Sequence, residues 1–190
     1  MSFISVLPEH PLRRQLEHTV EQVFRKEFRA TPAAFPQQMA AVLDSDGRPS
    51  AVTGLRFAAD GFFSERYLDL PVEQAVSAAL GLSIGRDQVV EFTSLASVRP
   101  GAAMPLVASI IRECLTKGYR CGLFTATDRL RALLRRAGLA VVDMVPATPD
   151  RIADPENWGS YYLHDPWVTA VSAEAVACLC DRHAEERRHA

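Results

Sequence analysis

The sequence predicts an α/β protein with a mixed sheet flanked by helices. Short apolar segments that suit strands alternate along the chain with longer segments whose apolar residues recur at helical spacing. Glycine and other turn residues mark most junctions between the two kinds of segment. In order, the pattern gives strand, helix, two or more strands, helix, strand, helix, strand, helix and two final strands. This order is typical of one α/β domain, which suits a chain of 190 residues.

The first half of the chain supplies the first strands and helices. Residues 3–7 are predicted as a strand, and Pro11 opens a helix that closes at "RATP" (29–32). Residues 39–43 and 51–57 are predicted as strands, and Asp46-Gly47 between them favours a hairpin turn. Residues 71–82 carry an apolar stripe and are predicted as a helix, which Gly81 breaks.

The second half continues the alternation. We predict a strand over 88–96, a helix over 102–117 and a strand over 119–124. The segment Thr125-Ala-Thr-Asp128 fits a capping box, so the next helix follows it and ends at Gly138. Residues 139–145 are predicted as a strand, and the aromatic segment WGSYYLHDPWV (158–168) as the last one. We expect one domain over 1–170 and a C-terminal helix or tail over 171–190.

The composition argues against several classes of protein. Lys and Arg number 21 against 23 Asp and Glu, so a formal net charge of −2 gives no reason to expect nucleic acid as a partner. No apolar run approaches the ~20 residues of a membrane span. The start MSFISVLPEHPLRR lacks the features of a signal peptide. Cys114, Cys121, Cys178 and Cys180 show no disulfide or zinc pattern, so we expect a cytoplasmic protein with free thiols and no metal.

The turn between the strand 88–96 and the helix 102–117 is the first candidate site. Its sequence SVRPGAA brings Arg99, Gly101, Ala102 and Ala103 to a helix N-terminus, where unpaired backbone N–H groups favour a phosphate. Gly101 permits close approach, and Arg99 can form a forked hydrogen bond with a phosphate. The neighbouring prolines carry no N–H. The alternative is therefore a tight turn with a solvated Arg.

This unit, together with the strand and capped helix of residues 118–139, resembles the cofactor half of the GNAT acyltransferase fold. There, a loop of Arg/Gln-x-x-Gly-x-Gly/Ala type holds the pyrophosphate of an acyl carrier. Arg99, Gly101 and Ala102 stand in this loop here, and the usual second glycine is missing.

Four blocks in order resemble the thermostable hemolysin family, which is similar in fold to GNAT enzymes and to acyl-homoserine lactone synthases. The blocks are FFSERYLD (62–69), VVEFTSLASVRPGAA (89–103), GYRCGLFTATDRLRALLRRAGL (118–139) and WGSYYLHDP (158–166). The resemblance implies a GNAT-like fold with a mixed, mostly antiparallel sheet. It also implies an N-acyltransferase that moves an acyl group from coenzyme A or acyl carrier protein to an amine, with an amino acid as one candidate.

Glu91 and Tyr161 are the candidate catalytic residues. Glu91 interrupts an apolar strand, and a partly buried carboxylate there could act as general base, directly or through water. A solvent-facing strand residue is the alternative. Many GNAT enzymes carry a Tyr on the helix after the second cofactor strand, as acid to the leaving thiolate. That helix has no Tyr here, so Tyr161 and Tyr162 are the possible substitutes, and on a strand only one of them would face the cleft.

Further residues are expected to bind the donor and the acceptor. Thr125 and Thr127 could hydrogen-bond a pantetheine arm, although helix capping explains them equally well. The resemblance places residues 62–69 beside the acceptor, where Glu65 could pair with a cationic amine or merely form a loop salt bridge. Arg86 could bind an acceptor carboxylate, a carrier phosphate or a surface acid. The full set of acceptor-binding candidates is Glu65, Tyr67, Arg86, Thr93 and Trp158.

Two partners and two other functions stay open at this level. An acidic acyl carrier protein suits an Arg-rich surface, and the candidate arginines, whose alternative is a set of solvated helix faces, are Arg112, Arg120, Arg129, Arg131, Arg135 and Arg136. The missing helix Tyr and the imperfect glycine loop favour a binding module that has lost the chemistry. A membrane-active hemolysin is the third candidate, and the sequence offers no amphipathic pore-forming segment for it.

Overall fold

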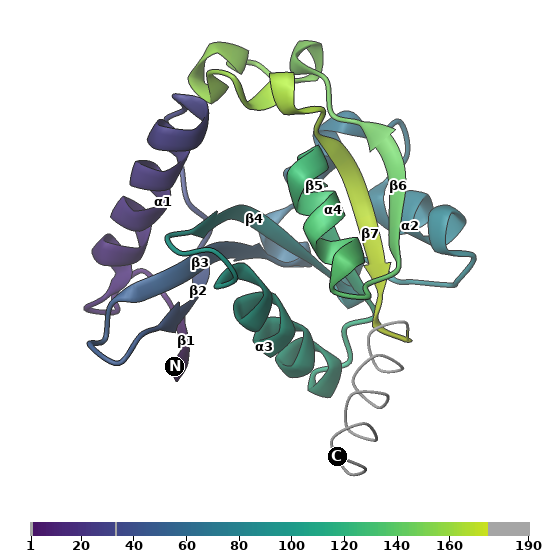
Figure 1. Ribbon diagram of the computed structural model, residues 1–190. Coiled ribbons are helices and arrows are strands. Elements are labelled where there is room, and N and C mark those ends of the chain that lie inside the picture. Colours follow the sequence, from purple (N-terminus) through teal and green to yellow (C-terminus); the bar gives the residue numbers. More distant parts are fainter. Residues whose placement is uncertain (1, 33, 175–190) are drawn as a thin grey trace.

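Seven strands form one sheet in the computed structural model, which describes residues 2–32 and 34–174 (Figure 1). Among these residues, only the pair β4–β5 is parallel, and every other neighbouring pair is antiparallel. The predicted mixed, mostly antiparallel sheet is therefore confirmed. In sheet order the strands are β1 (Ser2–Val6), β2 (Gln38–Leu43), β3 (Pro49–Arg56), β4 (Val89–Ser97), β5 (Cys121–Ala126), β7 (Trp167–Ser172) and β6 (Val141–Pro146).

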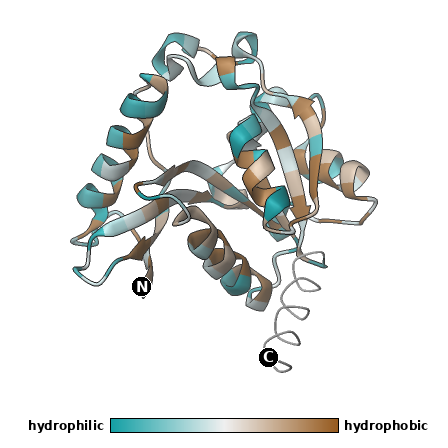
Figure 2. Cartoon of the chain, viewed as in Figure 1, coloured by the Kyte–Doolittle hydropathy of each residue, from teal (hydrophilic) through white to brown (hydrophobic). Residues whose placement is uncertain are grey.

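The four predicted helices cover both faces of this sheet. They are α1 (Arg13–Phe28), α2 (Val72–Leu80), α3 (Ala103–Thr116) and α4 (Asp128–Arg136). Helices α1 and α2 pack on one face, and α3 and α4 pack on the other. Strand β2 shows the alternation, because Met39 faces α1 whereas Ala40 faces α3. Figure 2 shows hydrophilic and hydrophobic residues alternating around α4, as expected for a helix with one buried side.

Strands β4 and β5 pair over only part of their length. Val89–Phe92 pair with Cys121–Phe124, and beyond Phe92 the two strands separate while β4 continues along β3. The register between β3 and β4 shifts at this point, and Ser94 adopts a left-handed backbone with φ 51°. This bulge bends β4 away from β5. The sheet therefore opens into a V between its two halves (Figure 1).

The segment between β6 and β7 differs from the sequence prediction. The expected strand over 158–168 is wrong in its first part, because Pro155–Trp158 and Tyr161–His164 form 3₁₀ turns and β7 begins at Trp167. Gly159 (φ 50°) and Asp165 (φ 46°) interrupt any extended run. The segment instead crosses to the end of α1, where the Ser160 N–H donates to the Phe28 carbonyl oxygen at 2.7 Å.

The cap of α4 also differs from the expectation. Thr127, and not Thr125, caps α4, since the Thr127 hydroxyl accepts a hydrogen bond from the Leu130 N–H at 3.4 Å. Strand β7 runs to Ser172, and the division into a domain over 1–170 and a helix or tail over 171–190 stays a prediction. The predicted terminal helix lies outside the described residues from position 175 onward.

Candidate functional site

A large cleft lies where β4 and β5 separate. Its volume is about 880 Å³, and α1, β4, the turn before α3, the end of β5, α4 and the segment after β6 contribute to its lining. Glu91 and the turn at Arg99 and Gly101 line this same cleft. The carboxylate and the helix N-terminus that the sequence assigns to one reaction therefore face a common space. The other predicted residues in the lining are Thr93, Ala103, Thr125, Thr127, Trp158 and Tyr161.

Glu91 is buried, with 1% of its surface exposed, so the alternative of a solvent-facing strand residue is wrong. Its Oε2 accepts a hydrogen bond from the Phe63 N–H at 2.6 Å. Its Oε1 accepts from the Ser64 N–H at 2.7 Å and from the Ser64 hydroxyl at 2.5 Å. Burial raises the pKa of the Glu91 carboxyl above its ordinary value of 4.5, against the opposing effects of these donors and of Arg56. Glu91 is thus a carboxylate with perturbed proton affinity at the wall of a cleft.

The hydroxyl of Ser64 links this carboxylate to β5. Ser64 Oγ lies 2.8 Å from Thr125 Oγ1, and Ser64 is fully buried whereas Thr125 is partly exposed and lines the cleft. Ser64 is not among the residues that the sequence marks as site candidates. It stands 27 positions before Glu91, and only its place in the block FFSERYLD pointed to it.

The turn before α3 leaves space at its backbone. Gly101 has φ +82°, and a Cβ at this residue would meet no described atom within 4 Å. The N–H groups in the first turn of a helix lack intrahelical partners. At α3, no side chain in the described part of the chain caps them. Ala102 is buried, and its N–H donates to the Arg99 carbonyl oxygen at 3.2 Å. The exposed Arg99 guanidinium pairs with Asp44 at 2.9 Å.

Three of the predicted acceptor residues do not line the cleft. Glu65 accepts from the Arg86 guanidinium with both oxygens, at 2.7 and 2.8 Å, and Arg86 lowers the pKa of the Glu65 carboxyl. This is the loop salt bridge that the sequence left as an alternative. The buried Tyr67 hydroxyl lies 2.7 Å from the Tyr162 hydroxyl. These contacts hold the turn Ser64–Tyr67 in place.

The remaining acceptor candidates do lie at the cleft. Thr93 lines it, and the buried Thr93 Oγ1 has no hydrogen-bond partner among the described residues. Trp158 packs against Phe63 and Tyr161, with ring centroids 5.4 Å apart in both pairs. Thr93 therefore lines the cleft while its hydroxyl oxygen is shielded within the chain, and Trp158 offers an apolar wall.

Tyr161 lines the cleft, whereas Tyr162 does not. The Tyr161 hydroxyl donates to the Thr125 carbonyl oxygen at 2.8 Å, and burial raises its pKa, so the phenol stays protonated at neutral pH. The two tyrosines lie on a 3₁₀ turn and not on alternate positions of a strand. The role of Tyr161 as an acid stays a prediction.

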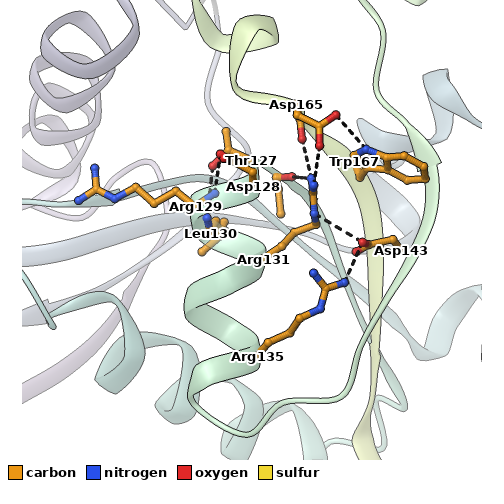
Figure 3. Close-up of polar contacts among 10 residues, drawn as sticks. Thr127, Asp128, Arg129, Leu130, Arg131, Arg135, Asp143, Asp165 and Trp167 are labelled. Atoms are coloured by element: carbon orange, nitrogen blue, oxygen red, sulfur yellow. Dashed lines mark hydrogen bonds and ion pairs between the residues drawn. The ribbon is translucent and has the colours of Figure 1, made fainter.

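Arg131, one of the arginines expected on a surface patch, is buried instead. Its guanidinium donates to the Ala126 carbonyl oxygen at 3.0 Å, to the Asp165 carbonyl oxygen at 2.5 Å and to the Asp165 carboxylate at 2.7 Å (Figure 3). Asp143 lies 3.6 Å from Arg131 Nε and 2.7 Å from Arg135. Arg131 therefore ties α4 and β5 to Asp165, which follows the turn Tyr161–His164 and lies two positions before the start of β7.

We expect Arg131→Met to destabilise the protein by about 2–3 kcal/mol, because it removes charged hydrogen bonds to carbonyl oxygens that are partly shielded from water. Arg129→Met is the matched control. Arg129 lies on the same helix with an exposed side chain, 3.7 Å from Glu27, and its replacement should change stability by less than about 0.5 kcal/mol. Urea unfolding of both variants measures the difference, and equal losses would contradict the anchoring role.

Within the described residues, no helix has the length and apolarity needed to cross a membrane. The same part of the chain contains no group of three or more His, Cys, Asp or Glu side chains placed to hold a metal ion.

The family model described as Thermostable hemolysin matches residues 6–177 of this sequence. The chain belongs to the thermostable hemolysin family. The sequence matches no curated protein. The resemblance seen in the four sequence blocks is thereby confirmed, and the match extends over strands and helices on both sides of the V.

Several solved structures share the fold of this hemolysin-family protein. A CoA-dependent acyl-homoserine lactone synthase, BjaI, with SAM and isopentyl-CoA has a TM-score of 0.59 at 18% identity, over 95% of this chain and 87% of that chain. The AHL synthase LasI has a TM-score of 0.59 at 12% identity, over 90% of each chain. An acetyltransferase of the GNAT family from Staphylococcus aureus Mu50 has a TM-score of 0.52 at 8% identity, over 90% of this chain and 99% of that chain. Identities this low show the fold alone, which is GNAT-like as the sequence predicts.

Proposed function

We propose that this protein is an N-acyltransferase that moves an acyl group from a thioester of coenzyme A or acyl carrier protein to an amine. The observation that carries the proposal is the cleft between β4 and β5, because it brings the buried Glu91 and the open turn before α3 together. Two structures with the same fold are named as acyl-homoserine lactone synthases and a third as an acetyltransferase. A free amino acid is the simplest acceptor to test.

The donor fits the cleft by size and charge. A volume of about 880 Å³ lies in the range of cofactor sites. The backbone around Gly101 and Ala103, together with Arg99, is the candidate cradle for the donor's phosphates. Thr127 also lines the cleft and is a candidate contact to a pantetheine arm. Cationic side chains outnumber acidic ones in the lining, which suits a phosphorylated ligand; they are Lys26, Arg56, Arg66, Arg99, Arg129 and Arg136, against Glu27, Glu91 and Asp154.

The reacting thioester would lie along the part of β4 that has left β5. Thr93, Ser94 and Leu95 belong to this part and line the cleft. Backbone N–H groups at such an edge are candidate donors to the oxygen that becomes negative during acyl transfer. Thr93 stays a candidate contact to the acceptor through those of its atoms that line the cleft.

The chemical step requires one proton to leave the acceptor first. An ammonium group gives a proton to Glu91, and the free amine then attacks the thioester carbon. The carbon–sulfur bond breaks, the nitrogen gives up its second proton and the thiolate takes one up. Tyr161 is the candidate acid for the thiolate. It lines the cleft, whereas Tyr162, the other tyrosine that the sequence offers for this role, does not.

Release of free thiol tests this function. Purified protein is mixed with acetyl-coenzyme A or octanoyl-coenzyme A and a panel of free amino acids and polyamines, and we expect thiol to appear only when protein, donor and amine are all present. Calorimetric binding of coenzyme A without thiol release would instead favour a binding module. Leakage of liposomes caused by the protein without any acyl donor would favour a membrane-active hemolysin.

A further inference from the structure

We propose that Ser64 and Thr125 form a proton relay that carries the acceptor's proton from the cleft to Glu91. This inference rests on the proposed acyl transfer and adds the route of the proton. The relay consists of two hydroxyl groups in series, Thr125 Oγ1 to Ser64 Oγ at 2.8 Å and Ser64 Oγ to Glu91 Oε1 at 2.5 Å. It joins β5, the 3₁₀ turn Ser64–Tyr67 and β4.

Burial explains why a relay is needed. Glu91 has 1% of its surface exposed, and both of its carboxylate oxygens already accept hydrogen bonds from the chain. An amine therefore has little room to contact the carboxylate directly. Thr125 is partly exposed at the cleft, so its hydroxyl is the accessible end of the chain of hydrogen bonds.

The direction of each hydrogen bond follows from the number of protons available. An ionised carboxylate only accepts, so the single Ser64 hydroxyl proton points to Glu91. Ser64 Oγ then accepts from Thr125, because Ser64 has no second proton to give. Thr125 Oγ1 in turn has donated its own proton and offers only lone pairs to the cleft. The site thus presents an acceptor, which selects a ligand group that carries N–H or O–H.

The ammonium group of the ligand, the Thr125 hydroxyl and the Ser64 hydroxyl each donate toward Glu91. This common direction permits proton transfer along the chain of hydrogen bonds. The acceptor's ammonium proton moves to Thr125 Oγ1, the Thr125 proton moves to Ser64 Oγ and the Ser64 proton moves to Glu91 Oε1. The ammonium becomes a neutral amine, the carboxylate becomes a carboxylic acid and both hydroxyls are regenerated. The charge of Arg56, which lies opposite Glu91 in the register of β3 and β4, acts on the Glu91 carboxylate.

Two variants interrupt the relay at different points. Thr125→Val keeps the shape of the side chain and removes the hydroxyl at the cleft, and Ser64→Ala removes the hydroxyl in the middle. Thr125→Val is the safer test of the two, because Ser64→Ala also leaves Glu91 Oε1 with one donor fewer. Thr125→Ser restores a hydroxyl. Thr169→Val is the matched control, since Thr169 lies opposite Phe124 on β7 and its buried hydroxyl has no partner among the described residues.

We expect Thr125→Val to lower kcat for amine acylation by about 10²-fold or more. Coenzyme A affinity measured by calorimetry shows separately whether Thr125 also binds the pantetheine arm. Thr125→Ser should recover most of the rate, and Thr169→Val should match the wild type. The pH profile separates a relay from a structural role. In Thr125→Val the remaining rate should keep rising with pH up to the pKa of the amine, without the wild-type plateau, because solvent then takes the proton.

Each outcome has a distinct meaning. If the wild type transfers the acyl group and Thr125→Val does so equally well, the relay is wrong while the acyltransferase stands. An unchanged pH profile with a lowered rate would likewise overturn the relay, because it would indicate a structural effect. A wild type that releases no thiol with any amine overturns the proposed function, and the relay fails with it.

Discussion

Glu91→Gln is expected to lower kcat for acyl transfer by about 10²–10⁴-fold, the range for loss of a general base. The amide keeps the volume of the side chain but cannot take up the proton of the acceptor. In the wild type, kcat/KM should rise as pH increases through the raised pKa of Glu91, because only the ionised carboxylate accepts a proton. That acidic limb should vanish in the variant. Thiol release followed across pH measures both effects.

The same substitution on α2 supplies the control. Glu73 lies 3.2 Å from Arg86 and does not line the cleft, so Glu73→Gln should leave kcat unchanged.

The pH dependence of stability gives a second measurement on Glu91→Gln. Because the folded pKa of Glu91 is raised, its contribution is fully present below the ordinary value of 4.5 and is lost as pH rises through the folded pKa. Glu91→Gln should not show this loss of stability as pH rises. If Glu91→Gln keeps the acyl-transfer activity of the wild type, Glu91 is not the base.

Gly159→Ala is expected to destabilise the protein by about 3–5 kcal/mol, combining backbone strain with overpacking. Gly159 has φ +50°, and a Cβ there would lie 2.2 Å from the Phe28 carbonyl oxygen and 2.7 Å from that of Arg29. Both atoms belong to the backbone at the end of α1, so they cannot turn aside as a side chain would. Thermal unfolding should show a Tm lowered by about 10 °C.

Gly61→Ala separates the two contributions to this loss. Gly61 also has a positive φ, +68°, but a Cβ there meets no described atom within 4 Å. Its replacement should therefore carry the backbone strain alone, about 1–3 kcal/mol. Equal losses in the two alanine variants would show that the close approach of α1 to the aromatic segment contributes nothing. A larger loss of stability in Gly159→Ala than in Gly61→Ala would show that the close contact between Gly159 and the end of α1 stabilises the wall of the cleft.

Much of the fold could be predicted because its signals are local. The stripes of α1 and α3 repeat every turn, and the strand around Glu91 is a short apolar run between turn residues. The prediction of a strand over 158–166 was wrong because the contacts that fold this segment are not local. Its aromatic residues favour a strand by composition, whereas contacts with α1 some 130 positions earlier fold it into 3₁₀ turns, as the bond from Ser160 to Phe28 shows.

The candidate site was predictable in its parts and not in its connections. The sequence pointed to Glu91, to the turn at Arg99 and to the threonines at the end of β5, and the structure places them at one cleft. The sequence alone offers no reason to connect Glu91 with Ser64. It also offers no reason to prefer Arg86 over a bound amine as the partner of Glu65. Those pairings depend on how the loop after β3 lies over the sheet, and a hydrogen bond across 27 positions leaves no periodic trace.

By itself, the sequence determined the class of fold, the order of its elements and the family, because these depend on patterns within a few turns of chain and on contiguous blocks. The tertiary structure decided which polar groups share a space. The separation of β4 from β5 after Phe92 creates the cleft, and packing then buries Glu91 with its carboxylate hydrogen-bonded to Phe63 and Ser64. Burial and distance are properties of the packed chain, so no stretch of sequence taken alone carries them.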